Sequence, residues 1–208
     1  MPPAADQYDA VIFDFGGVII DLDYGATIRA FDRLCGRETA HLYSQQQQKP
    51  LFDAFETGAI AAAEFRDGLR ELLAVDTSDA ELDAAWNAML GRIPERKVAF
   101  LRRFGQQTPI FLLSNTNEIH KAAFDRIFAE DHGHTHSGLG ELFVADYYSH
   151  EMGDRKPNPS IYRTVVDAHG LDPARTLFID DTAHNLPGAA EAGLLTWHLQ
   201  PSECITRL

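Results

Sequence analysis

The sequence predicts an α/β fold, in which a doubly wound parallel sheet forms the core and a helical cap is inserted after the first strand. Short apolar runs without polar alternation recur along the 208 residues, which is typical of strands covered on both faces. Most of the intervening segments suit helical crossovers, and strand–helix alternation favours a parallel sheet. The first interval, of about ninety residues, is far longer than the dozen or more that a crossover needs.

The expected strands share short runs of β-branched, aromatic and leucine side chains. Residues 11–13, 110–113 and 177–179 show this pattern most clearly, and each run stops at a polar residue. Residues 142–148 and 195–198 are the other two expected strands. All five would be buried within one sheet.

Two crossover helices are expected in the C-terminal half, at residues 161–169 and 187–192. The second has clear limits, because Pro187 suits a first helical position and Gly193 suits a helix stop. These helices would connect neighbouring strands of the sheet.

The long first interval carries helical periodicity and is expected to form the cap. We assign residues 23–93 to this cap domain, and residues 1–22 and 94–208 to the α/β core domain. Glutamines 45–48 are expected on a solvated helix face. The apolar residues at helical spacing are Phe65, Leu69, Leu72 and Leu73, followed by Leu82, Trp86, Met89 and Leu90.

Composition excludes several classes of partner. The chain has 18 Lys and Arg against 31 Asp and Glu, a net charge of −13, so neither nucleic acid nor an anionic membrane surface is an expected partner. A small anionic substrate remains compatible, since one lysine and a metal ion can reverse the field within a cleft.

The two cysteines and the N-terminus indicate a cytoplasmic protein. Cys35 and Cys204 do not form a disulfide framework and are expected to be free thiols. The N-terminus shows no basic segment followed by an apolar run. Residues 11–20, the longest apolar stretch, are interrupted by Asp14 and two glycines, so no segment is expected to span a bilayer.

Polar residues stand where three of the expected strands end: Asp14, the Ser114–Asn115 pair, and the Asp180–Asp181 pair. Ligands of open parallel sheets bind at the carboxyl ends of the strands. Three carboxylates brought together there would repel one another unless a cation lay between them. An all-oxygen donor set suits magnesium, and a magnesium site suits a phosphorylated substrate.

Four segments, taken in order, resemble the motifs of the haloacid dehalogenase (HAD) superfamily. They are residues 13–18 (FDFGGV), 113–116 (LSNT), 155–157 (RKP) and 178–181 (FIDD). The resemblance spans nearly the whole chain. It implies a Rossmannoid, HAD-like core and a phosphatase that works through a covalent aspartyl-phosphate.

The resemblance also implies roles for single residues. Asp14 would be the nucleophile that attacks phosphorus, and Lys156 would orient it and neutralise charge on the transferring group. The phosphoryl group would be bound by Gly16, Ser114, Asn115 and Lys156.

The same resemblance implies a site for Mg²⁺. Its ligands would be Asp14, the backbone carbonyl of Gly16, and Asp181, with Asp180 either a direct ligand or a residue behind one.

Gly16 departs from the family pattern. Most phosphatases of this superfamily carry a second aspartate there, as general acid and base, a function typically worth 10²–10⁴-fold. A subgroup similar to α-D-glucose-1-phosphate phosphatases also has glycine, and its pattern matches residues 114–117 and 18–23. A sugar phosphate such as a hexose 1-phosphate is therefore the expected kind of substrate, because an anomeric leaving group needs less protonation.

Gly16 also leaves other functions open. One is a catalytically weak phosphate-binding or regulatory protein that lost its acid-base group. Another is a 2-haloacid dehalogenase, which needs no such group. Dehalogenases of this superfamily lack an acidic pair in the fourth motif, so the presence of Asp180–Asp181 disfavours that function. A phosphonate hydrolase would need a cap lysine, and the cap offers only Lys49.

The cap is expected to select the substrate, a small phosphorylated metabolite. Glu56 is the expected polar contact, because residues 52–58 resemble a cap segment of the same subgroup, while Tyr24, Phe52 and Arg66 are candidates by residue type alone. The protein is expected to be a monomer or a small homo-oligomer.

Other polar residues have ordinary structural interpretations. Asp21 and Asp23 are expected in a turn or at a helix start. His132, His134 and His136 alternate as metal ligands can, but without a carboxylate or cysteine partner they are expected in a solvated loop.

Overall fold

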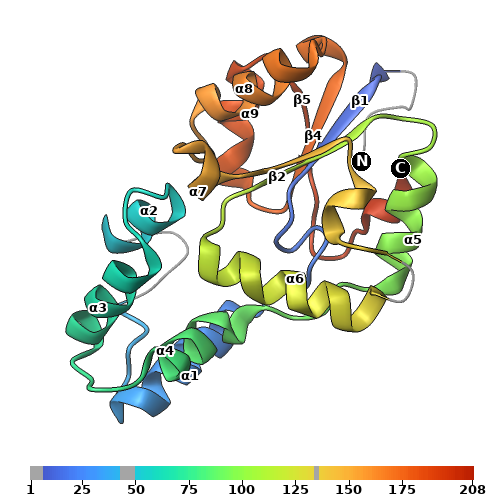
Figure 1. The fold of residues 1–208 in the computed structure, drawn as a ribbon. Helices are drawn as coiled ribbons and strands as arrows, with labels where there is room; N and C mark the ends of the chain where they lie inside the picture. Colours follow the sequence, from blue (N-terminus) through green and yellow to red (C-terminus); the bar gives the residue numbers. More distant parts are fainter. Residues whose placement is uncertain (1–6, 43–49, 134–135) are drawn as a thin grey trace.

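A five-stranded parallel sheet lies at the centre of the molecule, in the order β3-β2-β1-β4-β5 (Figure 1). The computed structural model describes residues 7–42, 50–133 and 136–208. The expected α/β class and parallel sheet are confirmed. The strands are β1 (Ala10–Phe13), β2 (Ile110–Ser114), β3 (Ala145–Tyr148), β4 (Thr176–Asp180) and β5 (Leu195–His198).

Strand β1 lies between β2 and β4, and the order of strands along the chain reverses there. Phe13 pairs with Leu112 on one side and with Ile179 on the other. One residue further, Asp14 is level with Leu113, one residue before the end of β2, and with Asp180, the last residue of β4. The carboxyl ends of β1, β2 and β4 therefore meet at one edge of the sheet.

Helices cover both faces of the sheet, as the apolar strand runs require. One face of β1, β2 and β4 packs against α5 (Glu95–Phe104) and α6 (Glu118–His132). The other packs against α8 (Pro159–His169) and α9 (Leu186–Glu191). The last two confirm the expected crossover helices to within two residues at each end.

Strand β3 is shorter than expected, because it starts at Ala145 rather than at residue 142. A 3-10 helix, η3 (Leu139–Leu142), precedes it instead. Leu139 and Leu142 are buried by this turn against the α5 side of the sheet. Leu142 is therefore apolar because it is buried in η3, and not because it belongs to a strand.

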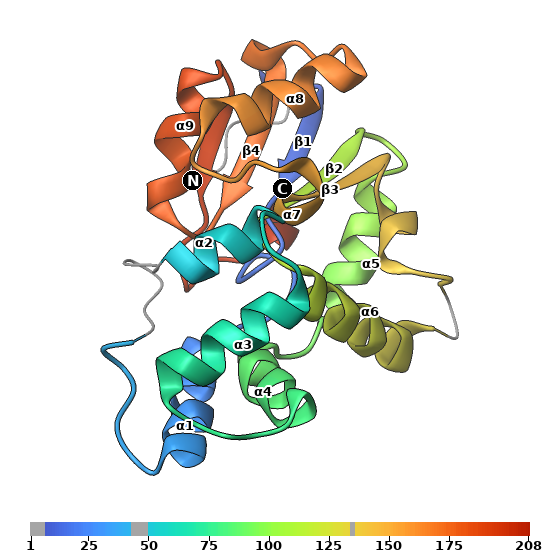
Figure 2. The same ribbon diagram turned by 60° about the vertical axis from the view of Figure 1, so that its left-hand side comes forward.

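The elements described between residues 23 and 93 are helical. They are α1 (Tyr24–Cys35), α2 (Pro50–Glu56), α3 (Ala62–Leu73), α4 (Asp79–Trp86) and the 3-10 helix η2 (Asn87–Met89). Figures 1 and 2 show them together beside the carboxyl edge of the sheet. The expected periodicity is present, since Phe65, Leu69 and Leu73 are buried on α3 and Leu82 and Trp86 on α4.

Aromatic packing dominates this helical layer. The Trp86 ring lies 5.4 Å from the rings of both Phe52 and Phe65, measured between centroids. Phe55 stacks on Phe65 with centroids 4.1 Å apart. The cluster has its own interior, separate from the two clusters on the faces of the sheet. The domain boundaries at 22/23 and 93/94 remain a prediction.

Two chain segments connect this layer to the sheet and run side by side. The Asp21 amide donates to the Arg92 carbonyl, and the Gly91 amide donates to the Asp21 carbonyl. Asp21 is ion-paired with Lys97 at 3.0 Å, while Asp23 caps α1 by accepting from the Ala26 amide. The expected helix-start position is therefore confirmed for Asp23, whereas Asp21 lies in the linker beside residues 91 and 92 and not in a turn or at a helix start.

The interpretation of His132 as a solvated loop residue is wrong. It is buried as the last residue of α6, with ring nitrogens 3.0 Å from a Glu95 carboxylate oxygen and 2.8 Å from the Ile93 carbonyl. These partners are distant in sequence, so the local pattern could not reveal them. His136 is half-buried, with Nδ1 3.8 Å from Glu141.

Cys35 and Cys204 are free thiols, as expected. Among the residues that the structure describes, no helix is both long and apolar enough to cross a membrane. The expectations for the N-terminal six residues, for residues 45–48, for Lys49 and for His134 concern parts outside the described residues.

Candidate active site

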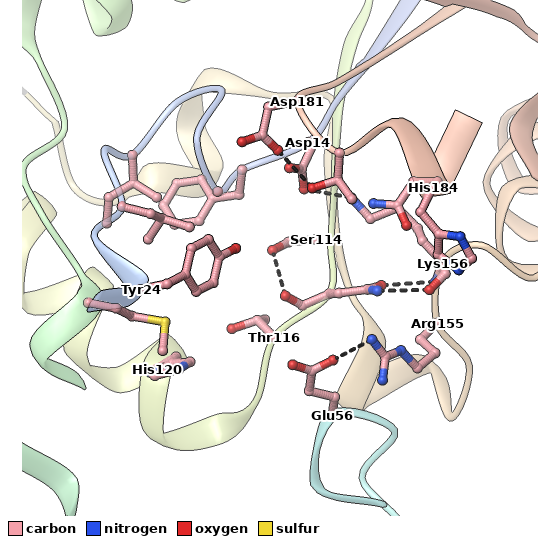
Figure 3. A pocket seen from close by; sticks show the side chains of 18 of the residues that line it. Asp14, Tyr24, Glu56, Ser114, Thr116, His120, Arg155, Lys156, Asp181 and His184 are labelled. Atoms are coloured by element: carbon pink, nitrogen blue, oxygen red, sulfur yellow. Dashed lines mark hydrogen bonds and ion pairs between the residues drawn. The ribbon is translucent and has the colours of Figure 1, made fainter. Parts of the chain in front are cut away.

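A cavity of about 1070 Å³ opens at the carboxyl edge of the sheet, between the strand ends and the helical layer. Figure 3 shows Asp14 and Asp181 at one end of it, Ser114 and Thr116 in the middle, and Glu56 with Arg155 at the other end. The sheet register brings these groups together, because Asp14, Ser114 and Asp180 end or follow the three adjacent strands. The convergence expected from the sequence is present.

Lys156 lies at the floor of this cavity and is almost completely buried, with 1% of its side chain exposed. Its Nζ donates to Asp14 Oδ1 at 2.6 Å and to Asp180 Oδ2 at 2.8 Å. Although burial alone would lower it, the two carboxylates raise the pKa of Lys156. The lysine is therefore a permanent cation that fixes the position of Asp14.

Asn115 holds the Lys156 segment in place. Its Nδ2 donates to the Lys156 carbonyl and its Oδ1 accepts from the Lys156 amide, both at 2.9 Å. The predicted donation from Asn115 to phosphate stays a prediction, because Asn115 lines the cavity and its Nδ2 carries a second N–H besides the one given to Lys156. The Ser114 hydroxyl makes only a long contact, 3.5 Å, to the next carbonyl. Asn117, not Ser114 or Asn115, caps helix α6.

The two aspartates after β4 differ in environment. Asp180 is fully buried and accepts from Lys156, from the Thr182 amide at 2.7 Å and from Asn185 Nδ2 at 2.9 Å. Asp181 is half-buried and lines the cavity, and Thr182 donates to it at 3.1 Å. The protein thus saturates Asp180 with donors and presents Asp181 to the cavity.

The carboxylates outnumber the cation that pairs with them. Ligand oxygens of Asp14, Asp180 and Asp181 lie within 4.8 Å of one another, against the single charge of Lys156. Burial, followed by the Asp180 carboxylate, raises the pKa of Asp14 to about 8 and also raises the pKa of Asp181. Three crowded hard oxygen donors with excess negative charge fit a divalent cation such as Mg²⁺.

Gly17 permits the close approach of Asp181. Its φ is +68°, and a Cβ there would lie 2.0 Å from Asp181 Oδ2. Both the backbone conformation and the space require glycine. At Gly16 a Cβ would meet the end of the Leu22 side chain at 2.7 Å, so this side of the loop is filled by the linker to the helical layer.

The helical layer supplies the other wall of the cavity. Tyr24 and Glu56 line it, and Figure 3 shows the Tyr24 ring with its hydroxyl directed toward Ser114. The other two candidates by residue type lie elsewhere. Phe52 is buried in the aromatic cluster, and Arg66 forms a two-bond ion pair with Asp83, at 2.8 Å each.

His120 lines the cavity, and the sequence reasoning missed it. It lies in the first turn of α6 with Nδ1 2.7 Å from Asn87 Oδ1, and its ring stacks on Trp86 at 4.6 Å. Burial lowers the pKa of His120 to about 3, which keeps the ring neutral at physiological pH. Its position three residues after the N-cap Asn117 could have placed His120 in the first turn of the helix that follows β2. Its partners Asn87 and Trp86 lie in the helical layer, so the sequence could not reveal its contacts.

Comparison with known proteins identifies the family. Residues 8–193 match the family model for haloacid dehalogenase-like hydrolases, and the chain belongs to that family. A D-ribitol-5-phosphate phosphatase of Bacteroides thetaiotaomicron is 28% identical over 187 residues, covering 90% of this chain and 89% of that protein. These findings support the expected class, a phosphoric monoester hydrolase. The glucose-1-phosphate phosphatase subgroup is not confirmed by them.

Solved structures agree with the fold. A HAD-family enzyme of Bacteroides thetaiotaomicron, an aspartate-to-alanine mutant in complex with magnesium and inorganic phosphate, superposes with a TM-score of 0.89 at 33% identity, covering 96% of this chain and 98% of that one. An L-2-haloacid dehalogenase of Xanthobacter autotrophicus, at 19% identity and a TM-score of 0.61 over 92% of this chain and 77% of that one, shares the fold alone.

Proposed function

We propose that this chain is a magnesium-dependent phosphatase that hydrolyses a small phosphorylated sugar or polyol through an aspartyl-phosphate on Asp14. The observation that carries the proposal is the Asp14 carboxylate at the end of β1, held 2.6 Å from Lys156 and close to two further aspartates at the edge of a cavity. Magnesium complexes of a family member 33% identical to this chain support it.

In the proposed reaction, an Asp14 carboxylate oxygen attacks phosphorus while the ester bond breaks, and the leaving oxygen takes up a proton from solvent to become the free alcohol. Water then cleaves the aspartyl-phosphate, which releases inorganic phosphate and restores Asp14. Lys156 holds one Asp14 oxygen and lowers the negative charge near the phosphoryl group. We assign binding of the phosphoryl oxygens to Ser114 and Asn115, which both line the cavity, and the Asn115 side chain would also position the Lys156 segment.

The metal would be held by Asp14, Asp181 and the Gly16 carbonyl. A bound Mg²⁺ would neutralise the excess carboxylate charge and orient the phosphoryl oxygens. We place Asp180 behind these ligands, because its oxygens already accept hydrogen bonds from Lys156, Thr182 and Asn185.

The kind of substrate follows from the cavity and the relatives. A volume of about 1070 Å³ leaves room for a leaving group of sugar size beyond the phosphate. Two candidates are pentitol 5-phosphates, suggested by the relative that is a D-ribitol-5-phosphate phosphatase, and hexose 1-phosphates, suggested by Gly16. The latter need less acid assistance, because their leaving group is more acidic than an ordinary alcohol.

The test is phosphate release from phenyl phosphate and from a panel of pentitol and hexose phosphates, with Mg²⁺ and with chelator. We expect Asp14→Asn to abolish turnover and chelator to suppress it in the wild type. Asp76→Asn, at an exposed residue of the helical layer, is the matched control and should retain activity. Equal turnover in Asp14→Asn and wild type would remove Asp14 from its role.

A second candidate function rests on Gly16, which provides no carboxylate for proton transfer. The chain would then bind phosphorylated ligands without turning them over. Tight binding of panel members by calorimetry, with no phosphate release at any pH, would favour this candidate over the phosphatase.

A further inference from the structure

His120 lies where the first turn of α6 meets the helical layer, and it lines the cavity beyond Ser114. Figure 3 shows Thr116 between Ser114 and His120. The three side chains share one cavity, so a leaving group attached to a phosphate near Ser114 has a continuous path to the imidazole. The steps of phosphoryl transfer proposed above do not use this ring.

The imidazole of His120 is held in one orientation. The His120 backbone amide donates to the Asn117 side chain at 3.0 Å, which fixes the residue in the first turn of α6. Its Nδ1 lies 2.7 Å from Asn87 Oδ1, and its ring stacks on Trp86 with centroids 4.6 Å apart. A ring that two elements already hold loses little conformational entropy when a ligand binds to it.

The contact with Asn87 decides which nitrogen of His120 carries the proton. Because burial lowers the pKa of His120 to about 3, the ring holds a single proton at neutral pH. Asn87 presents its carbonyl oxygen to Nδ1, so this proton lies on Nδ1. Nε2 then presents a lone pair. Among the described residues no group donates to Nε2, and the atom is not sealed from the cavity.

The surroundings of this lone pair are largely apolar. The 3-10 helix η2 packs against α6 here, and Trp86 and Met89 line the cavity. Phe124, one turn further along α6, lines it as well. A hydroxyl can donate to Nε2 in such surroundings, whereas an ammonium group gains no opposite charge from a neutral ring and a carboxylate has no proton to donate.

We propose that His120 is a specificity-determining residue, which accepts a hydrogen bond at Nε2 from a hydroxyl of the leaving group. This inference rests on the proposed phosphatase function and narrows its substrates to monoesters that carry a hydroxyl away from the phosphate. Asn87 acts through His120, as a positioning residue that keeps the proton on Nδ1. An ester without hydroxyls would displace water from Nε2 and leave its lone pair without a donor, which weakens binding.

The test compares each hydroxylated ester with an analogue that has no free hydroxyl. Ribitol 5-phosphate and pentyl phosphate form an open-chain pair, and glucose 1-phosphate and cyclohexyl phosphate form a ring pair. We expect the wild type to favour the hydroxylated member of at least one pair, by at least tenfold in kcat/KM. Equal use of both members in both pairs would overturn the proposal.

Two replacements of His120 separate Nε2 from the rest of the ring. His120→Asn keeps an amide on the Nδ1 side and removes Nε2, so the preference should fall by about fivefold to tenfold, mainly through a higher KM for the hydroxylated member. The kcat/KM of the analogue should change little. His120→Gln, whose amide extends to the position of Nε2, should retain most of the preference.

His41→Asn is the matched control. It makes the same replacement at an exposed histidine outside the cavity, and it should keep the wild-type preference. Equal losses for both members of a pair in His120→Asn would show that His120 only supports packing against Trp86, and would overturn the proposal. An unchanged preference in His120→Asn would overturn it too.

Failure of the phosphatase function remains distinguishable from failure of this inference. If no ester is hydrolysed, calorimetric affinities of the two members of each pair for the Mg²⁺-loaded protein replace the kinetic ratio. Tighter binding of the hydroxylated member, lost in His120→Asn and kept in His41→Asn, would support the role of His120 without turnover. Equal affinities would contradict it.

Discussion

At the residue scale, Lys156 carries the charge balance of the buried site. Its ammonium group is the shared partner of Asp14 and Asp180, and all three side chains are shielded from solvent. Removing one member of a buried ion-paired group leaves a charge without compensation, which costs more than the pair itself contributes.

Replacement of this lysine should therefore affect stability as well as activity. In chelator, we expect Lys156→Met to lower the free energy of unfolding by about 3–5 kcal/mol, because two carboxylates lose their cation. Urea unfolding of the variant and wild type measures this change. The double variant Lys156→Met with Asp14→Asn should recover part of the loss. A loss below about 1 kcal/mol would show that water reaches these carboxylates.

Replacement of Asp14 should have the opposite effect on stability, because without metal the protein should become more stable and not less. Its pKa in the folded state is raised to about 8, above the ordinary value of 3.8, because burial and Asp180 disfavour the ionised form. Its contribution to stability is therefore present at low pH and is lost as pH rises through about 8. Without metal, Asp14→Asn should be more stable than wild type at pH 8, by a margin that shrinks toward pH 5.

Thermal unfolding in chelator at several pH values tests this prediction. Asp76→Asn serves as the control, since its exposed side chain should give no such pH-dependent difference. A margin that grows toward acidic pH would contradict the sign of the Asp14 shift.

At the element scale, the hairpin of α2 and α3 is held to the core at three places. Arg155 pairs with the end of α2, and the Ala62 amide at the start of α3 donates to Glu118 at 2.6 Å. Between them, Gly58 packs against the His150 carbonyl, where a Cβ would lie 2.2 Å away. The position of Glu56 depends on these contacts.

Gly58→Ala should therefore displace the end of α2. Gly36→Ala is the matched control, because φ is +67° at Gly58 and +63° at Gly36 but nothing lies within 4 Å of a Cβ at Gly36. Both variants should lose about 1 kcal/mol of stability from the left-handed backbone. Only Gly58→Ala should lose more and raise KM for the substrate. Equal effects would show that the contact with His150 adjusts easily.

At the scale of the whole molecule, binding of a divalent cation should stabilise the fold. The proposed ligands Asp14 and Asp181 come together only when β1 and β4 lie side by side, so a bound ion would favour the folded state. Mg²⁺ at a hundred times its dissociation constant would add about 2.7 kcal/mol, which corresponds to a rise of about 5–11 °C in Tm for a chain of this size.

Calorimetric scans with and without Mg²⁺ measure this shift. Asp181→Asn should lose most of it, while Asp76→Asn should keep it. A shift that survives Asp181→Asn would mean that the ion binds elsewhere on this acidic chain.

The sequence by itself determined the frame of the molecule and the groups at its strand ends. Unalternated apolar runs predicted β1, β2 and β4 most clearly, since both faces of a parallel sheet are covered. The other two strands were also expected, but the one over residues 142–148 begins only at Ala145. Parallel strands align their carboxyl ends, so Asp14, Ser114 and the Asp180–Asp181 pair could be expected at one edge without coordinates. The long helical interval likewise followed from periodicity.

Only the tertiary structure decided how individual side chains are used. Asn115 turns to the backbone of Lys156, Asp180 is saturated with donors while Asp181 faces the cavity, and His120 stacks on Trp86. Arg155 meets Glu56 across almost a hundred residues of sequence. The directions of these side chains depend on contacts between distant segments, whereas the strand ends follow from local periodicity. This is why the sequence revealed the strand ends and not the side-chain directions.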